Sequence, residues 1–203
     1  IRAAFNPLDP GAIVPALAAA AAQLETAARA LEERRIPVGP TEDALRDLHF
    51  HLADEVADVT DALRKAANVT LDVVADDELV VPGQDFQLRL SVWNGGTEFV
   101  EVEAGPLLPP GWSAVPIEPP TGAVGVAPGE RVETTWRVTV PADAELTMPY
   151  FLRPGSEPAR GHDLYHWPDD PDVRGRPFAP DPVRGSFILR IADAFIGDER
   201  PAA

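Results

Sequence analysis

The first third of the chain carries apolar residues at three- and four-residue steps, the spacing that lines one face of a helix. Pro37 and Gly39 interrupt this pattern and separate two stripes. Two long helices joined by a short loop pack as an antiparallel hairpin, so the pattern predicts a helical hairpin within residues 1–68. The first stripe is Val14, Leu17, Ala21, Leu24, Ala28 and Leu31, and the second is Leu45, Leu48, Leu52, Val56, Val59 and Leu63.

Residues at the ends of these stripes match helix starts and stops. Asp9 followed by Pro10 is typical of an N-cap with proline in the first turn, although Pro15 leaves the exact start open. Thr41 is expected to cap the second helix. Asn68 is expected to end it, because asparagine tolerates the left-handed conformation that follows a helix.

From residue 69 onward, apolar and polar residues alternate in short runs separated by Pro-Gly and Asn-Gly turns, which is typical of antiparallel strands. The sequence therefore predicts an α+β fold, with the helical hairpin packed on an immunoglobulin-like antiparallel β-sandwich formed by residues 69–203. A loop-rich insertion is expected at about 148–185. The expected strands lie near residues 69–73, 86–93, 99–102 and 132–140, with a last strand at 186–191.

Composition narrows the classes of function. The chain has 33 acidic and 17 basic residues and a formal charge of -16, which disfavours binding to nucleic acids and to anionic membranes. It has no cysteine, which excludes disulfides and thiolate chemistry. Its longest apolar run, residues 16–22, is much shorter than the roughly 20 residues of a membrane span, so no membrane insertion is expected. The start at Ile1, without Met or signal peptide, predicts a fragment or processed product.

Several turn and corner motifs in the sandwich region resemble the immunoglobulin-like module attached to bacterial glycosidases and related sugar-processing enzymes. That module has a Pro-Gly turn, a strand ending in Asn-Gly, a Pro-x-Gly-Trp corner, a second Pro-Gly turn and a strand ending in Val-Pro. The corresponding runs here are Val81-Pro-Gly-Gln, Trp93-Asn-Gly-Gly, Pro109-Pro-Gly-Trp, Ala127-Pro-Gly-Glu and Val138-Thr-Val-Pro.

A second resemblance covers most of the chain. The segment Phe5-Asn-Pro-Leu leads into the hairpin, and Thr147-Met-Pro-Tyr follows the sandwich strands. This order is similar to the region after the catalytic domain in long bacterial members of the PIG-L/LmbE-like deacetylase family. The metal motif of that family, Ala-His-Pro-Asp-Asp-Glu, is absent, so no catalytic residue is carried over and no cofactor is expected in this chain.

The histidines are the first candidates for chemistry. His49 and His51 are two residues apart on a helix and point in different directions, so they cannot share one metal ion. His162 and His166, with Asp163 between them, could hold Zn²⁺ or Mn²⁺ if the segment were helical. The surrounding prolines favour a loop. The alternatives are therefore a metal site, a solvated or packing loop, and an acidic loop at a saccharide site or domain interface.

Aromatic residues are the second candidates, because flat rings stack on sugars. Trp136 lies on the inward face of its strand and is expected in the core, and Trp112 is expected to close one end of the sandwich. Trp93 lies on the opposite, outward face of its strand. Our hypothesis is a saccharide-binding platform formed by Trp93, Tyr165 and Trp167; the alternative is that these rings cover the sandwich or pack on the hairpin.

Taken together, the sequence and its resemblances predict a non-catalytic accessory region of a larger periplasmic or extracellular hydrolase, similar to amino-sugar de-N-acetylases. Its expected partners are the adjacent catalytic domain of the same chain and a saccharide. The alternatives are an autonomous carbohydrate-binding module, an adhesive immunoglobulin-like module, and a metal-dependent enzyme built on the histidine loop.

Overall fold

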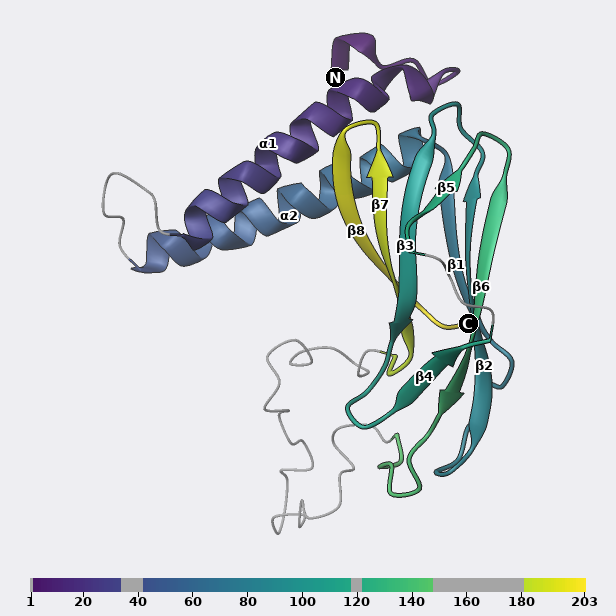
Figure 1. Cartoon of the computed structure of the whole chain (residues 1–203). Coiled ribbons are helices and arrows are strands. Elements are labelled where there is room, and N and C mark those ends of the chain that lie inside the picture. Colours follow the sequence, from purple (N-terminus) through teal and green to yellow (C-terminus); the bar gives the residue numbers. More distant parts are fainter. Residues whose placement is uncertain (1, 34–41, 118–121, 148–180) are drawn as a thin grey trace, which may run out of the picture.

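The computed structural model describes residues 2–33, 42–117, 122–147 and 181–203 and has two parts (Figure 1). Two helices pack side by side, and two four-stranded antiparallel sheets follow them as a sandwich. The predicted α+β fold, a helical hairpin on an antiparallel β-sandwich, is therefore confirmed. The expected insertion at 148–185 lies almost entirely outside the described residues, as does the Thr41 cap.

The hairpin is preceded by two short 3₁₀ turns, η1 (Arg2–Ala4) and η2 (Pro10–Ile13). Helix α1 spans Val14–Glu32 and α2 spans Glu42–Ala66. The prediction that Asp9 caps the first helix is wrong, because Asp9 precedes η2 and its side chain makes no capping hydrogen bond. Pro15 instead occupies the first turn of α1, where its missing N–H costs nothing.

Helix α2 ends where the sequence predicts, just before Asn68. Asn68 has a φ of 53°, in the left-handed region, and its N–H donates to the carbonyl of Lys65 at 3.0 Å. The chain reverses there and enters the first strand directly.

Each sheet mixes strands from distant parts of the sequence. The first sheet has the order β1-β2-β6-β4, and the second has the order β5-β3-β7-β8. The bounds of the first sheet's strands are β1 Val69–Ala75, β2 Asp85–Asn94, β6 Arg131–Thr139 and β4 Ser113–Pro116. Those of the second are β5 Val124–Val126, β3 Val100–Leu107, β7 Arg184–Ile191 and β8 Ala194–Pro201.

Strands β4, β5 and β8 were not expected, and β7 is not the last strand. The β7–β8 connection is a tight turn without Gly, Pro or Asn, so it lacks the usual signal of a hairpin. Ala192 adopts a φ of 51° in this turn, a conformation that glycine or asparagine would adopt more easily. β4 and β5 were missed because they have only four and three residues.

One core joins the hairpin and the sandwich. The near half of the hairpin packs where the edge strands β1 and β8 approach each other, with α2 against β1 and α1 against β8. Farther along, the two helices run together away from the sandwich (Figure 1). The sandwich therefore buries only the part of each apolar stripe that lies next to it. The hairpin residues in the shared core are Ile13, Val14, Leu17, Ala18, Leu63, Ala66 and Ala67.

Candidate functional site

The joint between the hairpin and the sandwich is the most elaborate polar arrangement among the described residues. At its centre the corner after α2 meets the connection from β2 to β3. The N–H of Gly95 donates to the Asn68 carbonyl at 2.9 Å, and Asn68 Nδ2 donates to the Gly95 carbonyl at 2.8 Å. These reciprocal bonds hold the two corners together.

Asn94 organises the β2–β3 connection from inside. Its side chain is fully buried, and Nδ2 donates to the carbonyls of Glu98 at 2.8 Å and Val126 at 2.9 Å. Its Oδ1 accepts from the N–H of Gly96 at 3.1 Å. Gly96 then passes so close to the helix end that a Cβ there would lie 2.1 Å from the Ala67 carbonyl oxygen. The motif Asn94-Gly95-Gly96 therefore serves this docking contact.

Arg64 forms the second half of the joint. Its side chain is 13% exposed, and Nη1 donates to the carbonyl of Val69 at 3.0 Å. Nη2 donates to Asp61 at 2.8 Å on the same helix. Nε lies 3.0 Å from Asp198 Oδ2 on β8, but its N–H makes no hydrogen bond, so this contact is ionic. Arg200 Nη2 approaches the same Asp198 oxygen at 2.7 Å. Arg64 thus ties α2 to both edge strands.

Asp61 is the residue whose titration this network changes. The hydrogen bond from Lys65 lowers the pKa of the Asp61 carboxyl below its usual value, Arg64 adds to that effect, and partial burial opposes it. The Lys65 Nζ to Asp61 Oδ2 distance is 2.6 Å. Asp61 is consequently held as a carboxylate that pairs with two cations.

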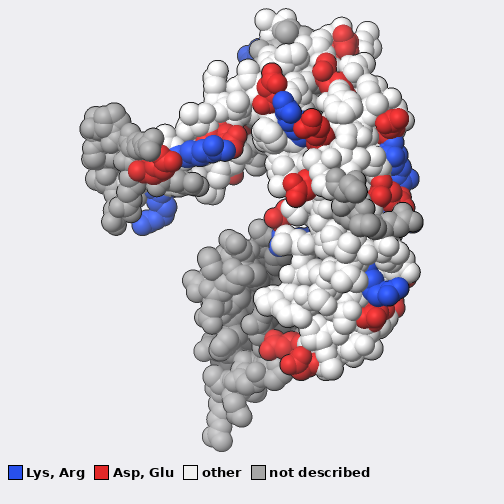
Figure 2. Space-filling view, in the orientation of Figure 1, with Lys and Arg blue, Asp and Glu red and all other residues white. Residues whose placement is uncertain are grey.

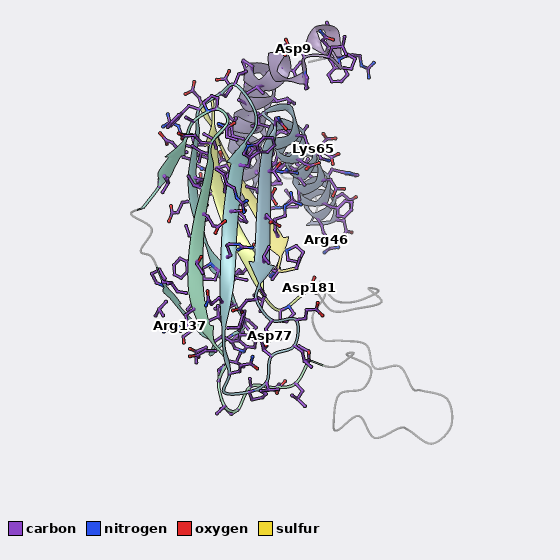
Figure 3. The ribbon with its side chains drawn as sticks, turned by 90° about the vertical axis from the view of Figure 1, so that its right-hand side faces the viewer. Asp9, Arg46, Lys65, Asp77, Arg137 and Asp181 are labelled. Atoms are coloured by element: carbon purple, nitrogen blue, oxygen red, sulfur yellow. The ribbon has the colours of Figure 1, made fainter. Side chains whose placement is uncertain are left out.

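The joint holds the hairpin and the sandwich together, and it offers no nucleophile beside a base. No group of three or more His, Asp or Glu side chains in the part of the chain that the structure describes could hold a metal ion. His49 and His51 are both exposed on α2. The metal candidates His162, Asp163 and His166 lie outside the described residues. Figure 3 shows the labelled Asp77, Arg137 and Asp181 at the end of the sandwich opposite the hairpin.

The tryptophans divide as the strand pattern predicts. Trp136 is partly buried against the core, and its Nε1 donates to Thr134 Oγ1 at 3.1 Å. Trp112 also packs against the core and meets Phe86 edge to face, with ring centroids 6.2 Å apart. The prediction that Trp136 lies in the core is therefore confirmed, and Trp112, expected to close one end of the sandwich, packs on the core as well.

Trp93 is 43% exposed on the outer face of the first sheet. Its register partners are Thr70 on β1 and Arg131 on β6, and its indole lies over Gly95, where a Cβ would be 2.4 Å from Cη2. Tyr165 and Trp167, the other members of the predicted platform, lie outside the described residues. The platform therefore remains a prediction.

Sequence reasoning missed Asn94 and Arg64 as the residues of a joint. Asn94 was interpreted as part of an ordinary Asn-Gly turn signal, and Arg64 was not singled out. The available signal was the pair of glycines after Asn94, because two adjacent glycines allow another backbone to approach closely. Nothing in the local sequence indicates that Arg64 meets Asp198, 134 positions farther along the chain.

One helical stretch is longer and more apolar than the run at residues 16–22 indicated. Pro10–Leu31 has 22 residues, and its most apolar window has a mean hydropathy of 1.3, so by length and composition alone it could cross a membrane. The expectation that no segment inserts into a membrane was based on that short run and stays a prediction, because length and composition alone do not distinguish a membrane span from a core helix. About 28% of the window is buried in the structure, where its first turns join the shared core.

The described architecture defines a class, a helical hairpin docked on an eight-stranded antiparallel sandwich. Residues 80–152 match the family model described as the NPCBM-associated, NEW3 domain of alpha-galactosidase. This match bears out in part the resemblance to accessory modules of sugar-processing enzymes, and it brings no link to the PIG-L/LmbE-like family. It covers less than half of the chain, from the turn before β2 to beyond β6. No curated protein matches the chain significantly.

Two solved structures match the chain at low similarity. A FixG-related protein from Vibrio parahaemolyticus is 14% identical with a TM-score of 0.32, and the alignment covers 64% of this chain and 91% of that one. The sporulation control protein Spo0M from Bacillus subtilis is 12% identical with a TM-score of 0.28, covering 66% and 49%. These scores are too low for either structure to carry an argument about this chain.

Proposed function

We propose that this chain is a non-catalytic accessory region of a larger carbohydrate-active hydrolase, in which hairpin and sandwich act as one spacer. The match of residues 80–152 to a domain of alpha-galactosidases supports the class of parent. The shared core and the joint at Asn94 and Arg64 support the spacer role, because they fix how the hairpin leaves the sandwich. A fixed exit angle orients whatever domain the hairpin contacts.

The parent enzyme is the finer part of the proposal. The order of hairpin, sandwich and Thr147-Met-Pro-Tyr favours a PIG-L/LmbE-like amino-sugar deacetylase that works in the periplasm or outside the cell. The reading frame that encodes Ile1 tests this proposal directly. An in-frame deacetylase domain with its Ala-His-Pro-Asp-Asp-Glu motif and an export signal would support this parent enzyme. A different catalytic domain would show that the parent is another enzyme, and the proposed spacer role would be unaffected.

The spacer role is tested in that parent with two substrates. Gly96→Ala disturbs the joint, so we expect kcat/KM on a polymeric substrate to fall while hydrolysis of a small chromogenic substrate is unchanged. Gly105→Ala is the matched control, since a Cβ there meets no atom within 4 Å. Equal activity of both variants on the polymer would show that the orientation of the hairpin is irrelevant to function.

A second candidate is an autonomous carbohydrate-binding module, and the exposure of Trp93 favours it. The indole lies on a polar sheet face, where Arg131 Nη2 binds both Ser91 Oγ at 3.2 Å and Glu133 Oε2 at 3.0 Å. An aromatic ring beside fixed polar groups suits a sugar. Binding of the isolated chain on a glycan array, lost in Trp93→Ala, would support this candidate.

A further inference from the structure

A row of side chains crosses the outer face of the second sheet. The strand register places Glu101 of β3 opposite Arg190 of β7, and Arg190 opposite Phe195 of β8. On the other side of Glu101 lies Gly125 of β5, and the ring of Phe99 lies over it. A Cβ on Gly125 would be 2.3 Å from Phe99 Cζ. The row is therefore phenyl, carboxylate, guanidinium, phenyl.

A shallow groove of about 300 Å³, at the lower end of the range for ligand sites, lies over the part of this row formed by Phe99, Glu101 and Arg190. Phe195 adjoins the groove on the far side of Arg190. Arg190 forms its polar floor, with Nη1 3.2 Å from Glu101 Oε2 and Nη2 3.9 Å from Asp193 Oδ1. The guanidinium also lies 5.7 Å from the centroid of the Phe195 ring. Figure 2 shows neighbouring acidic and basic side chains on the upper part of the sandwich, near the upper ends of β7 and β8. The groove is lined by Glu98, Phe99, Glu101, Arg190, Ala192 and Asp193.

The two phenyl rings are exposed and held in place. Phe99 is 55% exposed and Phe195 is 61% exposed, although an apolar ring gains nothing from water. Gly125 leaves the space that the Phe99 ring occupies. Ala192, with its φ of 51°, lies in the turn between Arg190 and the fully exposed Asp193, whose Oδ1 is 3.9 Å from Arg190 Nη2. Such strain is often kept at binding sites, where it fixes side chains before a ligand arrives.

The chemistry of the row selects its ligand. Carboxylates outnumber the single guanidinium along the groove, so phosphates and uronic acids are repelled. The floor offers both donors and acceptors, the Phe99 ring offers flat apolar surface within the groove, and the Phe195 ring offers it beside Arg190. A pyranose has hydroxyls around its edge and C–H groups on its faces. The row spans three strand spacings, about 14 Å, which is long enough for linked sugar rings.

We propose that this groove and the adjoining Phe195 ring bind an uncharged oligosaccharide, whose rings stack on Phe99 and Phe195 and whose hydroxyls bind Arg190 and Glu101. The site lies on the opposite sheet from Trp93 and shares no residue with that platform. It is also independent of the spacer role, because a chain can bind saccharide with or without a catalytic neighbour.

The test uses the whole 203-residue chain and neutral cello-, manno- and N-acetylated chito-pentaose, with polygalacturonate as the anionic probe, in calorimetric titrations. We expect one neutral series to bind and polygalacturonate not to bind. Phe99→Ala and Phe195→Ala should each weaken binding about 5- to 10-fold, the scale of a single aromatic contact. Phe50→Ala is the matched control, because Phe50 is 64% exposed on α2, away from the groove.

The outcomes separate the proposals. Loss of affinity in Phe99→Ala and Phe195→Ala with an unchanged melting temperature, while Trp93→Ala binds normally, supports the groove. If only Trp93→Ala loses affinity for the neutral oligosaccharide, the groove proposal is wrong and the saccharide binds on the first sheet. If no neutral oligosaccharide binds the chain at all, the groove proposal is also wrong. If Phe99→Ala fails to fold, Phe195→Ala decides, since that side chain is 61% exposed on the edge strand β8. None of these results bears on the polymer assay that tests the spacer role.

Discussion

The near and far halves of the helical hairpin carry the same apolar pattern but differ in what covers it. Near the sandwich, Leu17 and Leu63 are almost completely buried in the shared core. Far from it, Leu48 of the stripe is 47% exposed, and Phe50, which lies outside the stripe, is 64% exposed. The stripe therefore determines that a helix forms and which side is apolar. Leu31, at the far end of α1, is 4% exposed without belonging to the shared core, so contact between the helices also buries part of the stripes. The remaining burial depends on where the edge strands β1 and β8 meet the hairpin, which the helix sequence does not encode.

The largest expected effect compares a leucine from each half. Leu63→Ala should lower the free energy of unfolding by about 2–5 kcal/mol, because it leaves a cavity in the shared core. Leu48→Ala should cost about 1 kcal/mol or less, because half of that side chain is already in water. Urea unfolding of both variants, at equal m-values, measures the difference. Similar losses would mean that the far half is covered in solution by a second copy of the chain.

The next effect concerns the contact between the corners. Gly96→Ala should cost about 1–3 kcal/mol, because its Cβ would meet the Ala67 carbonyl oxygen and backbone must move. Gly105→Ala, where a Cβ meets nothing, should change stability by no more than about 0.5 kcal/mol. Thermal unfolding of the two variants side by side checks this. If Gly96→Ala leaves the stability unchanged, the β2–β3 connection must lie farther from the end of α2 than the structure shows.

The same comparison applies to charged pairs. Arg64→Met should cost about 1–2 kcal/mol, because it leaves the nearly buried Asp198 with Arg200 as its remaining partner and the Val69 carbonyl without this donor. Arg46→Met removes an exposed pair with Asp43 in the far half and should cost about 0.5 kcal/mol or less. Denaturant unfolding at low and high salt separates them, since only the exposed pair is strongly screened. Equal costs would contradict the burial of the Arg64 contact.

Local pattern was sufficient for the elements with regular periods and strong stops. The two stripes, the left-handed turn at Asn68 and the inward face of Trp136 were all predictable from neighbouring residues. The β7–β8 hairpin was not, because Ala192 replaces the residues that normally mark such a turn. The groove was not either, because Phe99, Arg190 and Phe195 become neighbours only through the order β5-β3-β7-β8. Sheet order is set by long-range packing, which periodicity does not report.

The smallest expected effect is a pH dependence at the edge of the joint. Because Lys65 lowers the pKa of Asp61 in the folded chain, Asp61 contributes stability above its unfolded pKa of about 3.9. That contribution is lost as the pH falls through the lower folded value. Asp61→Asn should therefore be slightly less stable than the unsubstituted chain at pH 7, and the gap should close as the pH falls below about 4 and through the lowered pKa of Asp61 in the folded chain.

Melting temperatures of Asp61→Asn and of the unsubstituted chain, from pH 7 downward, measure this difference in stability. We expect about 0.5 kcal/mol or less at pH 7, because Asp61 and Lys65 are 44% and 68% exposed and solvent screens their interaction. Lys65→Met provides the matched control, since it removes the main cause of the lowered pKa while leaving Arg64 in place. A gap that widens toward low pH would reverse the sign and show that burial, not the pairing with Lys65, dominates the titration of Asp61.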